Sequence, residues 1–139
     1  QLVKHSFLRW NEVSRRYVDD EPEFYVPEVW RGKSADKKQG SEGIVEGVIP
    51  TEYNGVCLDV YQQLLDGGVA PEMARMVLPQ SIVTEWDWSG SLDAFARMCH
   101  LRCASDTQYE SRIVAAQISD VMRDLFPVSW DALLQTGEE

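Results

Sequence analysis

The sequence has few features that would tie the chain to a membrane or to nucleic acid. None of its apolar runs approaches the ~18 residues that a membrane-spanning helix needs. Lysine and arginine together number 13 against 23 aspartate and glutamate residues, a net charge of −10 at pH 7. Nucleic acid polymers and anionic membranes are bound by basic faces. We therefore expect neither a membrane nor a nucleic acid polymer as a partner.

Cysteine is also scarce. Three cysteines, an odd number, cannot form a closed disulfide framework, which favours a reducing, cytoplasmic setting. Cys99 and Cys103 are one helical turn apart, a spacing at which two thiolates can share a metal. Both fall on an apolar helical face and no fourth ligand is evident, so core packing is the favoured interpretation. The sequence predicts no metal site.

The signatures of nucleophilic catalysis and of phosphate loops are missing. His5 and His100 are the only histidines, and they lie in unrelated contexts. Neither a Gly-x-Ser-x-Gly elbow nor a glycine-rich phosphate loop occurs.

The positive charge that is present gathers at the front of the sequence and then on arginines. Residues 1–17 carry four cations against one acid, and every basic residue after Lys38 is an arginine. The planar fork of arginine suits a phosphate or the edge of a pyrimidine. Arg75 and Arg102 both lie off the apolar faces of their expected helices. A small-anion site is one interpretation; solvated charges and surface ion pairs are the other.

Hydrophobic periodicity predicts several helices. We expect a helix over 52–66 that stops at Gly67-Gly68, a short helix over 71–77 closed by Pro79, and a last helix over 130–134. Between them, Ser91 caps a helix whose apolar face is Leu92, Phe95, Ala96, Cys99 and Cys103. A capping box, Ser105 with Gln108 or Thr107 with Glu110, opens a long helix ended by Pro127. Its expected core face is Val114, Ile118, Val121, Met122 and Leu125.

Strand signals are fewer. Alternation predicts a strand over 82–88, residues 23–27 are β-prone with Pro27 confining them to an edge, and the polar, glycine-rich residues 32–43 indicate a mobile loop. No regular βαβ alternation occurs. The predicted fold class is therefore α+β, a helix-rich mixed domain with a small, mainly antiparallel sheet.

Five motifs, in order, resemble those of the flavin-dependent thymidylate synthases. Residues 4–17 resemble the family signature, Arg-His-Arg, two residues, Ser, one residue, Asn-Glu, one residue, Ser, one residue, Arg-Tyr. Here Lys4, Ser6 and Arg9 replace its first arginine, second arginine and first serine. The other motifs are Phe24-Tyr25-Val26-Pro27, Lys38-Gln39-Gly40-Ser41, Gly68-Val69-Ala70 with Ala74-Arg75-Met76-Val77-Leu78-Pro79, and Leu101-Arg102 with Gln108-Tyr109-Glu110.

The resemblance implies a fold, an assembly and an activity. Residues 1–139 would be a single domain matching the C-terminal two-thirds of the family fold, in a homotetramer whose active sites draw on several subunits. The implied reaction is reductive methylation of dUMP to dTMP with methylenetetrahydrofolate, FAD and NADPH. Hydroxymethylation of dUMP, modification of dCMP, and a catalytically inactive nucleotide-binding homologue are the alternatives.

The resemblance also implies roles for individual residues. Arg102 matches the catalytic arginine that lies against the uracil ring and favours loss of its proton. The positions that match dUMP-binding residues are Gln1, Lys4, Glu12, Val13, Ser14, Arg15, Arg16, Arg75 and Arg102. Those that match flavin-contacting residues are Lys4, His5, Ser6, Glu12, Ser91, Asp93 and Arg97. We add Arg9 to the flavin contacts, on the hypothesis that it returns the cation lost at Ser6.

Overall fold

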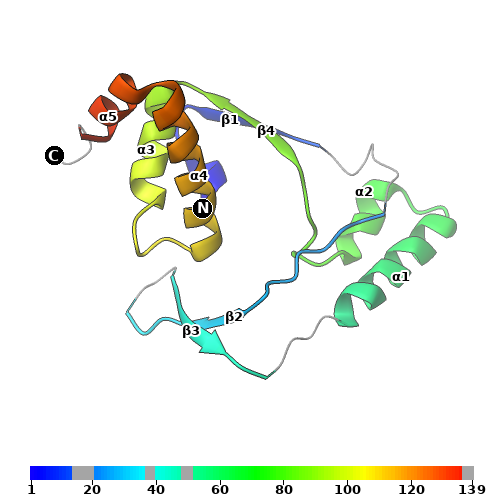
Figure 1. Cartoon of the computed structure of the whole chain (residues 1–139). Helices are drawn as coiled ribbons and strands as arrows, with labels where there is room; N and C mark the ends of the chain where they lie inside the picture. Colours follow the sequence, from blue (N-terminus) through cyan, green and yellow to red (C-terminus); the bar gives the residue numbers. More distant parts are fainter. Residues whose placement is uncertain (14–20, 37–39, 48–51, 136–139) are drawn as a thin grey trace. The chain divides into compact units, whose positions relative to one another are not determined.

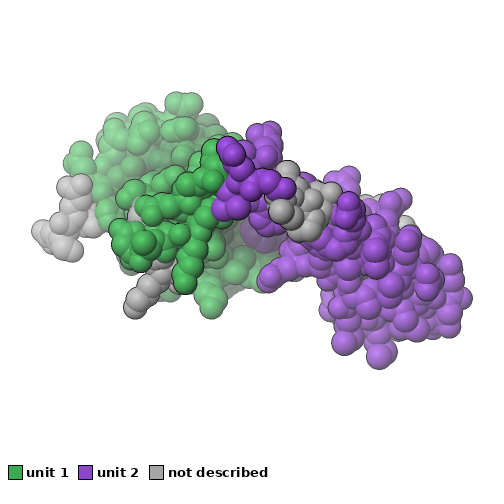
Figure 2. Space-filling view, turned by 90° about the horizontal axis from the view of Figure 1, so that it is seen from below, with its two compact units in different colours: residues 1–10, 31–44, 88–139 green, residues 11–30, 45–87 purple. Residues whose placement is uncertain are grey.

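The computed structural model describes residues 1–13, 21–36, 40–47 and 52–135. The chain forms two compact units (Figure 2). The first unit contains residues 1–10, 31–44 and 88–139, and the second contains residues 11–30 and 45–87. The predicted α+β class is confirmed, although the described strands form two small sheets instead of one. The expectation of one domain over residues 1–139 stays a prediction.

The first unit is built on three helices: α3 (Leu92–Arg102), α4 (Tyr109–Leu125) and α5 (Pro127–Gln135). Each contacts the other two (Figure 1). Their shared core contains Phe95, Ala96, Met98 and Cys99 of α3, Ala115 of α4 and Trp130 of α5. The buried indole N–H of Trp130 donates to Ser119 Oγ at 3.1 Å, so the polar atom of this core residue is satisfied.

The start of α3 is fixed by its cap and by the strand before it. Ser91 Oγ accepts a hydrogen bond from the backbone N–H of Ala94 at 3.2 Å, which confirms Ser91 as the predicted cap. Trp88 packs edge-to-face on Phe95 with ring centroids 5.5 Å apart. A side chain at Gly90 would meet Leu8 Cδ2 at 2.5 Å, so glycine permits this close approach.

The strands differ from the sequence prediction at two places. β1 (Leu8–Glu12) pairs with β4 (Trp86–Gly90), which begins four residues later than the strand predicted over 82–88. Residues just before β4 instead pair with the β-prone segment 23–27, through a bridge between Phe24 and Ile82. The segment predicted as a loop, 32–43, contributes to β2 (Trp30–Lys33) and β3 (Ser41–Val45). Every residue of β3 is exposed, so no apolar alternation marked it.

The second unit holds α1 (Glu52–Asp66), α2 (Pro71–Ala74) and the 3₁₀ turn η2 (Arg75–Val77). α1 contacts both of the others. It ends as predicted: Gly68 has φ +80°, the N–H of Gly68 donates to Leu65 C=O, and that of Val69 donates to Leu64 C=O. Pro71 opens α2 at the position where the first turn tolerates proline.

Two predictions about buried helix faces were wrong. Cys103 is the C-cap of α3 and is exposed. On α4 the buried residues are Ala115 and Ser119, whereas Val121 is 54% exposed and Leu125 is 64% exposed. Small side chains at Ala115 and Ser119 let the neighbouring helices approach closely, because they leave room for Cys99 and Trp130. Ile118 and Met122 do pack partly against the core, as predicted, whereas Val114, Val121 and Leu125 are exposed.

The predicted capping box of α4 was also wrong. The N-cap of α4 is Gln108, and it has no side-chain cap. Its backbone N–H instead donates to Gln1 Oε1 at 3.2 Å. The hydroxyl of Thr107 donates to Leu101 C=O and so serves the end of α3.

Truncating the core of the first unit should destabilise the protein. We predict that Met98→Ala lowers the free energy of unfolding by about 2–5 kcal/mol, because Met98 is fully buried and a cavity replaces it. Met76→Ala is the matched control: Met76 is 79% exposed, so its loss should change stability by less than about 0.5 kcal/mol. Urea denaturation measures both, and equal effects would contradict this packing.

Candidate active site

The first site element is a hydrogen bond between Arg102 and His5. Arg102 is the last residue of α3 and is half-buried. Its position agrees with the prediction that it lies off the apolar face of the helix. Its Nε–H donates to His5 Nε2 at 2.9 Å. An accepting Nε2 means that the imidazole is neutral and carries its proton on Nδ1. Burial, followed by the positive charge of Arg102, lowers the pKa of His5 from its ordinary value of 6.5.

The residues expected to contact a flavin lie in the first unit, with the exception of Glu12, which belongs to the second. Lys4 ends the 3₁₀ turn η1 (Leu2–Lys4) and Ser6 follows it; Arg9 lies on β1. Leu8 lies close to Gly90, so the segment that contains Lys4, Ser6 and Arg9 approaches the start of α3. The other three expected contacts, Ser91, Asp93 and Arg97, lie at or near that start. The six exposed or half-exposed side chains are Lys4, Ser6, Arg9, Ser91, Asp93 and Arg97.

The charges of this cluster fit an anionic dinucleotide. Within the described residues, neither Lys4 nor Arg9 forms an ion pair, so both cations can face a diphosphate. Arg97 Nη2 pairs with Asp93 Oδ2 at 3.0 Å one helical turn away, in a solvent-exposed pair of modest strength. Ser91 Oγ is already engaged as the cap of α3. The flavin contacts that the resemblance implies at these residues stay a prediction.

The second unit contains a pocket of about 170 Å³ with Arg75 in its wall. Glu12 lies in the same wall and accepts a hydrogen bond from Thr84 Oγ1 at 2.6 Å. Among the described residues, Arg75 makes no ion pair, so its guanidinium is available to an anion. The complete lining is Glu12, Val13, Arg75, Leu78, Ile82, Val83 and Thr84. A cation, an oriented carboxylate and apolar walls suit a small ligand with both polar and apolar parts.

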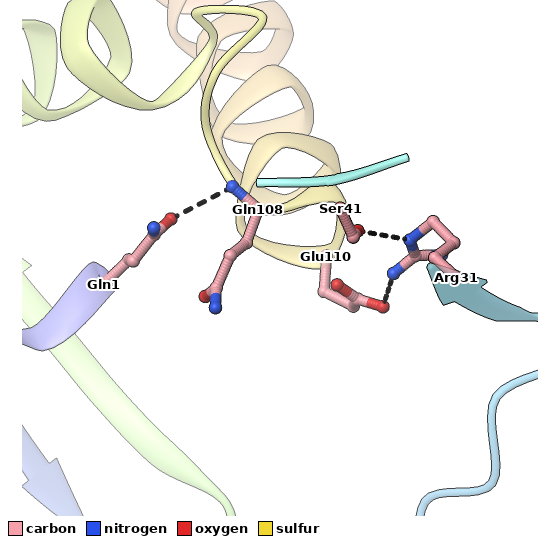
Figure 3. Close-up of polar contacts among 5 residues, drawn as sticks. All are labelled: Gln1, Arg31, Ser41, Gln108 and Glu110. Atoms are coloured by element: carbon pink, nitrogen blue, oxygen red, sulfur yellow. Dashed lines mark hydrogen bonds and ion pairs between the residues drawn. The ribbon is translucent and has the colours of Figure 1, made fainter. Parts of the chain in front are cut away.

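Sequence reasoning missed the polar cluster around Arg31 (Figure 3). Arg31 Nε donates to Ser41 Oγ at 3.0 Å, its Nη2 pairs with Glu110, and its guanidinium lies 4.4 Å from the centroid of the Tyr109 ring. These contacts hold β2 and β3 on the first turn of α4. Gln1 also contacts this end of α4, through the N–H of Gln108 described above. The motif at 108–110 was visible in the sequence, but nothing there singled out Arg31.

The predicted substrate-binding residues divide between the two units. Gln1, Lys4 and Arg102 belong to the first unit. Glu12, Val13 and Arg75 belong to the second, where they line one pocket. Ser14, Arg15 and Arg16 lie outside the described residues. The sequence also did not mark Thr84 as a partner of Glu12, although its place in the alternating segment 82–88 was visible.

Two other kinds of site are absent from the part of the chain that the structure describes. No three His, Cys, Asp or Glu side chains gather there in a way that could hold a metal ion. No helix there combines the length and the apolar character needed to cross a membrane.

Comparison with known proteins places the chain in a family. Residues 1–128 match the family model described as thymidylate synthase complementing protein. The chain belongs to this family. Among curated relatives, a flavin-dependent thymidylate synthase of Thermus thermophilus is 35% identical over 136 residues, and that of Dictyostelium discoideum is 32% identical over 147 residues.

A solved structure with a related fold is a UMP/dUMP methylase, PolB from Streptomyces cacaoi, bound with 5-Br UMP. It superposes with a TM-score of 0.77 at 30% identity, over 94% of this chain and 65% of that one. The two synthases are matched over 95% and 100% of this chain. The chain spans about half of their lengths, 50% and 48%. The resemblance inferred from the five motifs is confirmed.

The difference in burial between Cys99 and Cys103 predicts a difference in their reactivity. Burial, followed by the nearby Cys103, raises the pKa of Cys99 to about 12, and its thiol donates to Ala115 C=O at 3.4 Å. We predict that iodoacetamide labels the exposed Cys103 much faster than Cys99 in the folded protein, as measured by peptide mass spectrometry. Denaturant should remove the difference. Equal labelling of the two thiols in the folded protein would contradict the buried position of Cys99.

Proposed function

We propose that the chain carries out the reductive methylation of dUMP at carbon five of the uracil ring. Methylenetetrahydrofolate supplies the carbon, and NADPH supplies two electrons as hydride through FAD. The ring loses its C5 proton, the transferred methylene becomes a methyl group, and tetrahydrofolate and NADP⁺ are released with dTMP. The observation that carries the proposal is the hydrogen bond that orients Arg102 on His5, because the resemblance matches Arg102 to the family's catalytic arginine.

Arg102 is the proposed catalytic residue. Its guanidinium stabilises the negative charge that develops on the uracil ring as C5 becomes nucleophilic and then loses its proton. The Nε–H is held by His5, so the Nη1 and Nη2 groups remain to meet a ring oxygen or nitrogen. A permanent cation suits this role, because arginine does not lose its charge at any physiological pH.

The remaining residues bind and orient. Arg75 and Glu12 of the second unit's pocket would hold dUMP, with Arg75 as the cation for its phosphate or pyrimidine edge. Gln1, Lys4, Val13, Ser14, Arg15 and Arg16 are the other dUMP contacts that we propose. A flavin would be held by Lys4, His5, Ser6, Arg9, Glu12, Ser91, Asp93 and Arg97, and when bound it would relay the hydride from NADPH. No cysteine is needed as a nucleophile, consistent with the burial of Cys99.

Product analysis tests this function and separates it from its alternatives. The chain is incubated with FAD, NADPH and methylenetetrahydrofolate and with dUMP, UMP or dCMP in parallel, and products are identified by mass. We expect dTMP from dUMP. We also expect Arg102→Ala to lower turnover by about 10²-fold or more while leaving circular dichroism unchanged, because Arg102 is outside the core.

The control for this experiment is Arg123→Ala. Arg123 lies on α4, where it pairs with Asp120 at 3.7 Å and with Asp131 at 3.5 Å, so its loss should leave turnover near the parent value. A hydroxymethylated product or a product from dCMP alone would overturn the methylation of dUMP. A protein that takes up no flavin and turns over none of the nucleotides would support the inactive homologue.

We also propose that the chain assembles with copies of itself, as a tetramer. The support from this structure is the exposed face of α4, on which a shallow hollow of about 240 Å³ is lined by Val114, Gln117, Ile118, Val121 and Met122. Val121, one of these lining residues, is 54% exposed. Contiguous apolar surface of this kind marks interaction sites in soluble proteins. A second copy of the same face is its proposed partner.

A charge on this face tests the assembly. We predict that Val121→Asp lowers the molecular mass measured by light scattering and leaves the helical circular dichroism unchanged, because the side chain is exposed in the isolated chain. The matched control is Val128→Asp on α5, since Val128 is 83% exposed and lies outside the hollow. An unchanged mass for Val121→Asp would exclude this face as an interface.

A further inference from the structure

The hydrogen bond between His5 and Arg102 joins residues 97 positions apart in the sequence. His5 directly follows η1, and Arg102 is the last residue of α3. Both belong to the first unit, where Leu2 and Leu8 on either side of His5 pack against the helical core. The bond therefore connects two segments that the core already holds.

We propose that His5 is a positioning residue for Arg102. Its neutral imidazole holds the Nε–H of the guanidinium through Nε2 and so directs the Nη1 and Nη2 groups toward the uracil ring. This inference rests on the proposed function, because it assigns a purpose to the orientation of Arg102. It differs from the flavin contact expected at His5, which the Nδ1–H side of the same ring can still make.

The chemistry of the two groups supports this role. Arginine has only donors, so a fixed orientation needs an acceptor, and a neutral imidazole nitrogen provides one without cancelling the positive charge. A carboxylate partner would also orient the guanidinium, but it would neutralise the charge that the reaction uses. Among the described residues, no carboxylate forms an ion pair with Arg102. The free Nη1 and Nη2 groups keep their full charge for the substrate.

Protonation of His5 would end this arrangement. An imidazolium has donors on both ring nitrogens, so its Nε2–H would face the Nε–H of Arg102 and repel it. Burial lowers the pKa of His5 most, and the positive charge of Arg102 of α3 acts in the same direction. The imidazole of His5 therefore stays neutral to a lower pH than an ordinary histidine, and the orientation of Arg102 is lost only as the pH falls through the lowered pKa of His5.

The first test reads the tautomer directly and needs no turnover. Nitrogen-15 NMR distinguishes protonated from unprotonated ring nitrogens, and His100 is the only other histidine, so a His100→Gln variant assigns both signals. We expect the Nδ1–H tautomer for His5, with a pKa below 6.5. In Arg102→Leu we expect the Nε2–H tautomer to dominate and the pKa to rise. An Nε2–H tautomer in the parent protein would overturn the proposal.

The second test compares two substitutions at His5. His5→Gln places an amide oxygen near the position of Nε2 and keeps an acceptor, whereas His5→Leu removes it. We expect His5→Leu to lower kcat by about 10²-fold with a smaller change in the KM for dUMP, because misorientation of a bound catalytic group costs turnover more than binding. His5→Gln should recover most of the loss and should lack the fall in activity at low pH.

The outcomes separate this inference from the proposed function. If the parent protein makes dTMP but His5→Leu matches it in kcat and in pH profile, His5 does not position Arg102. If His5→Gln is as impaired as His5→Leu, the acceptor is not the property that matters, and the inference also fails. If the tautomer is Nδ1–H and no nucleotide is methylated, the bond stands and the proposed function fails.

Discussion

The packing of α3 against α4 and α5 is the constraint on which the first unit depends. Met98 and Cys99 are buried in its centre, and Trp130 closes the core from α5. The helices come close because α4 presents Ala115 and Ser119 at the contact. Because one face of α3 is buried, the rotation of the helix about its axis is fixed. The side chains next to that face therefore leave the helix in defined directions. Arg102 gains its defined position from this core, and His5 then restrains the side chain.

The charge distribution of the chain suits the proposed chemistry. The chain has an excess of acidic residues and a local group of cations in residues 1–17, and this charge distribution favours a small anion over a polyanion. Arg75 and Arg102 use their forks differently. The first lies in the wall of a pocket with Glu12, and the second is held from behind by an imidazole. Lysine could provide the charge at either position but not the planar geometry.

Much of the fold could be predicted from the sequence because its signals are local. Ser91, Gly68 and Pro71 act through caps and turns that depend on neighbouring residues only. The errors arose where contacts between distant segments decide the outcome. β3 has no buried residue to create an alternating pattern, and α4 buries small residues because the neighbouring helices require space there. Arg31, Thr84 and His5 each form a side-chain bond with a partner at least 72 positions away, namely Glu110, Glu12 and Arg102.

The central claim is that the chain activates C5 of a uracil nucleotide with Arg102. Its most direct test is the fate of hydrogen at that carbon. With dUMP deuterated at C5 and the full set of flavin, NADPH and methylenetetrahydrofolate, the account predicts that deuterium passes to water in step with product and that Arg102→Ala stops this release. Full retention of deuterium in the nucleotide by the flavin-bound parent protein would contradict the account.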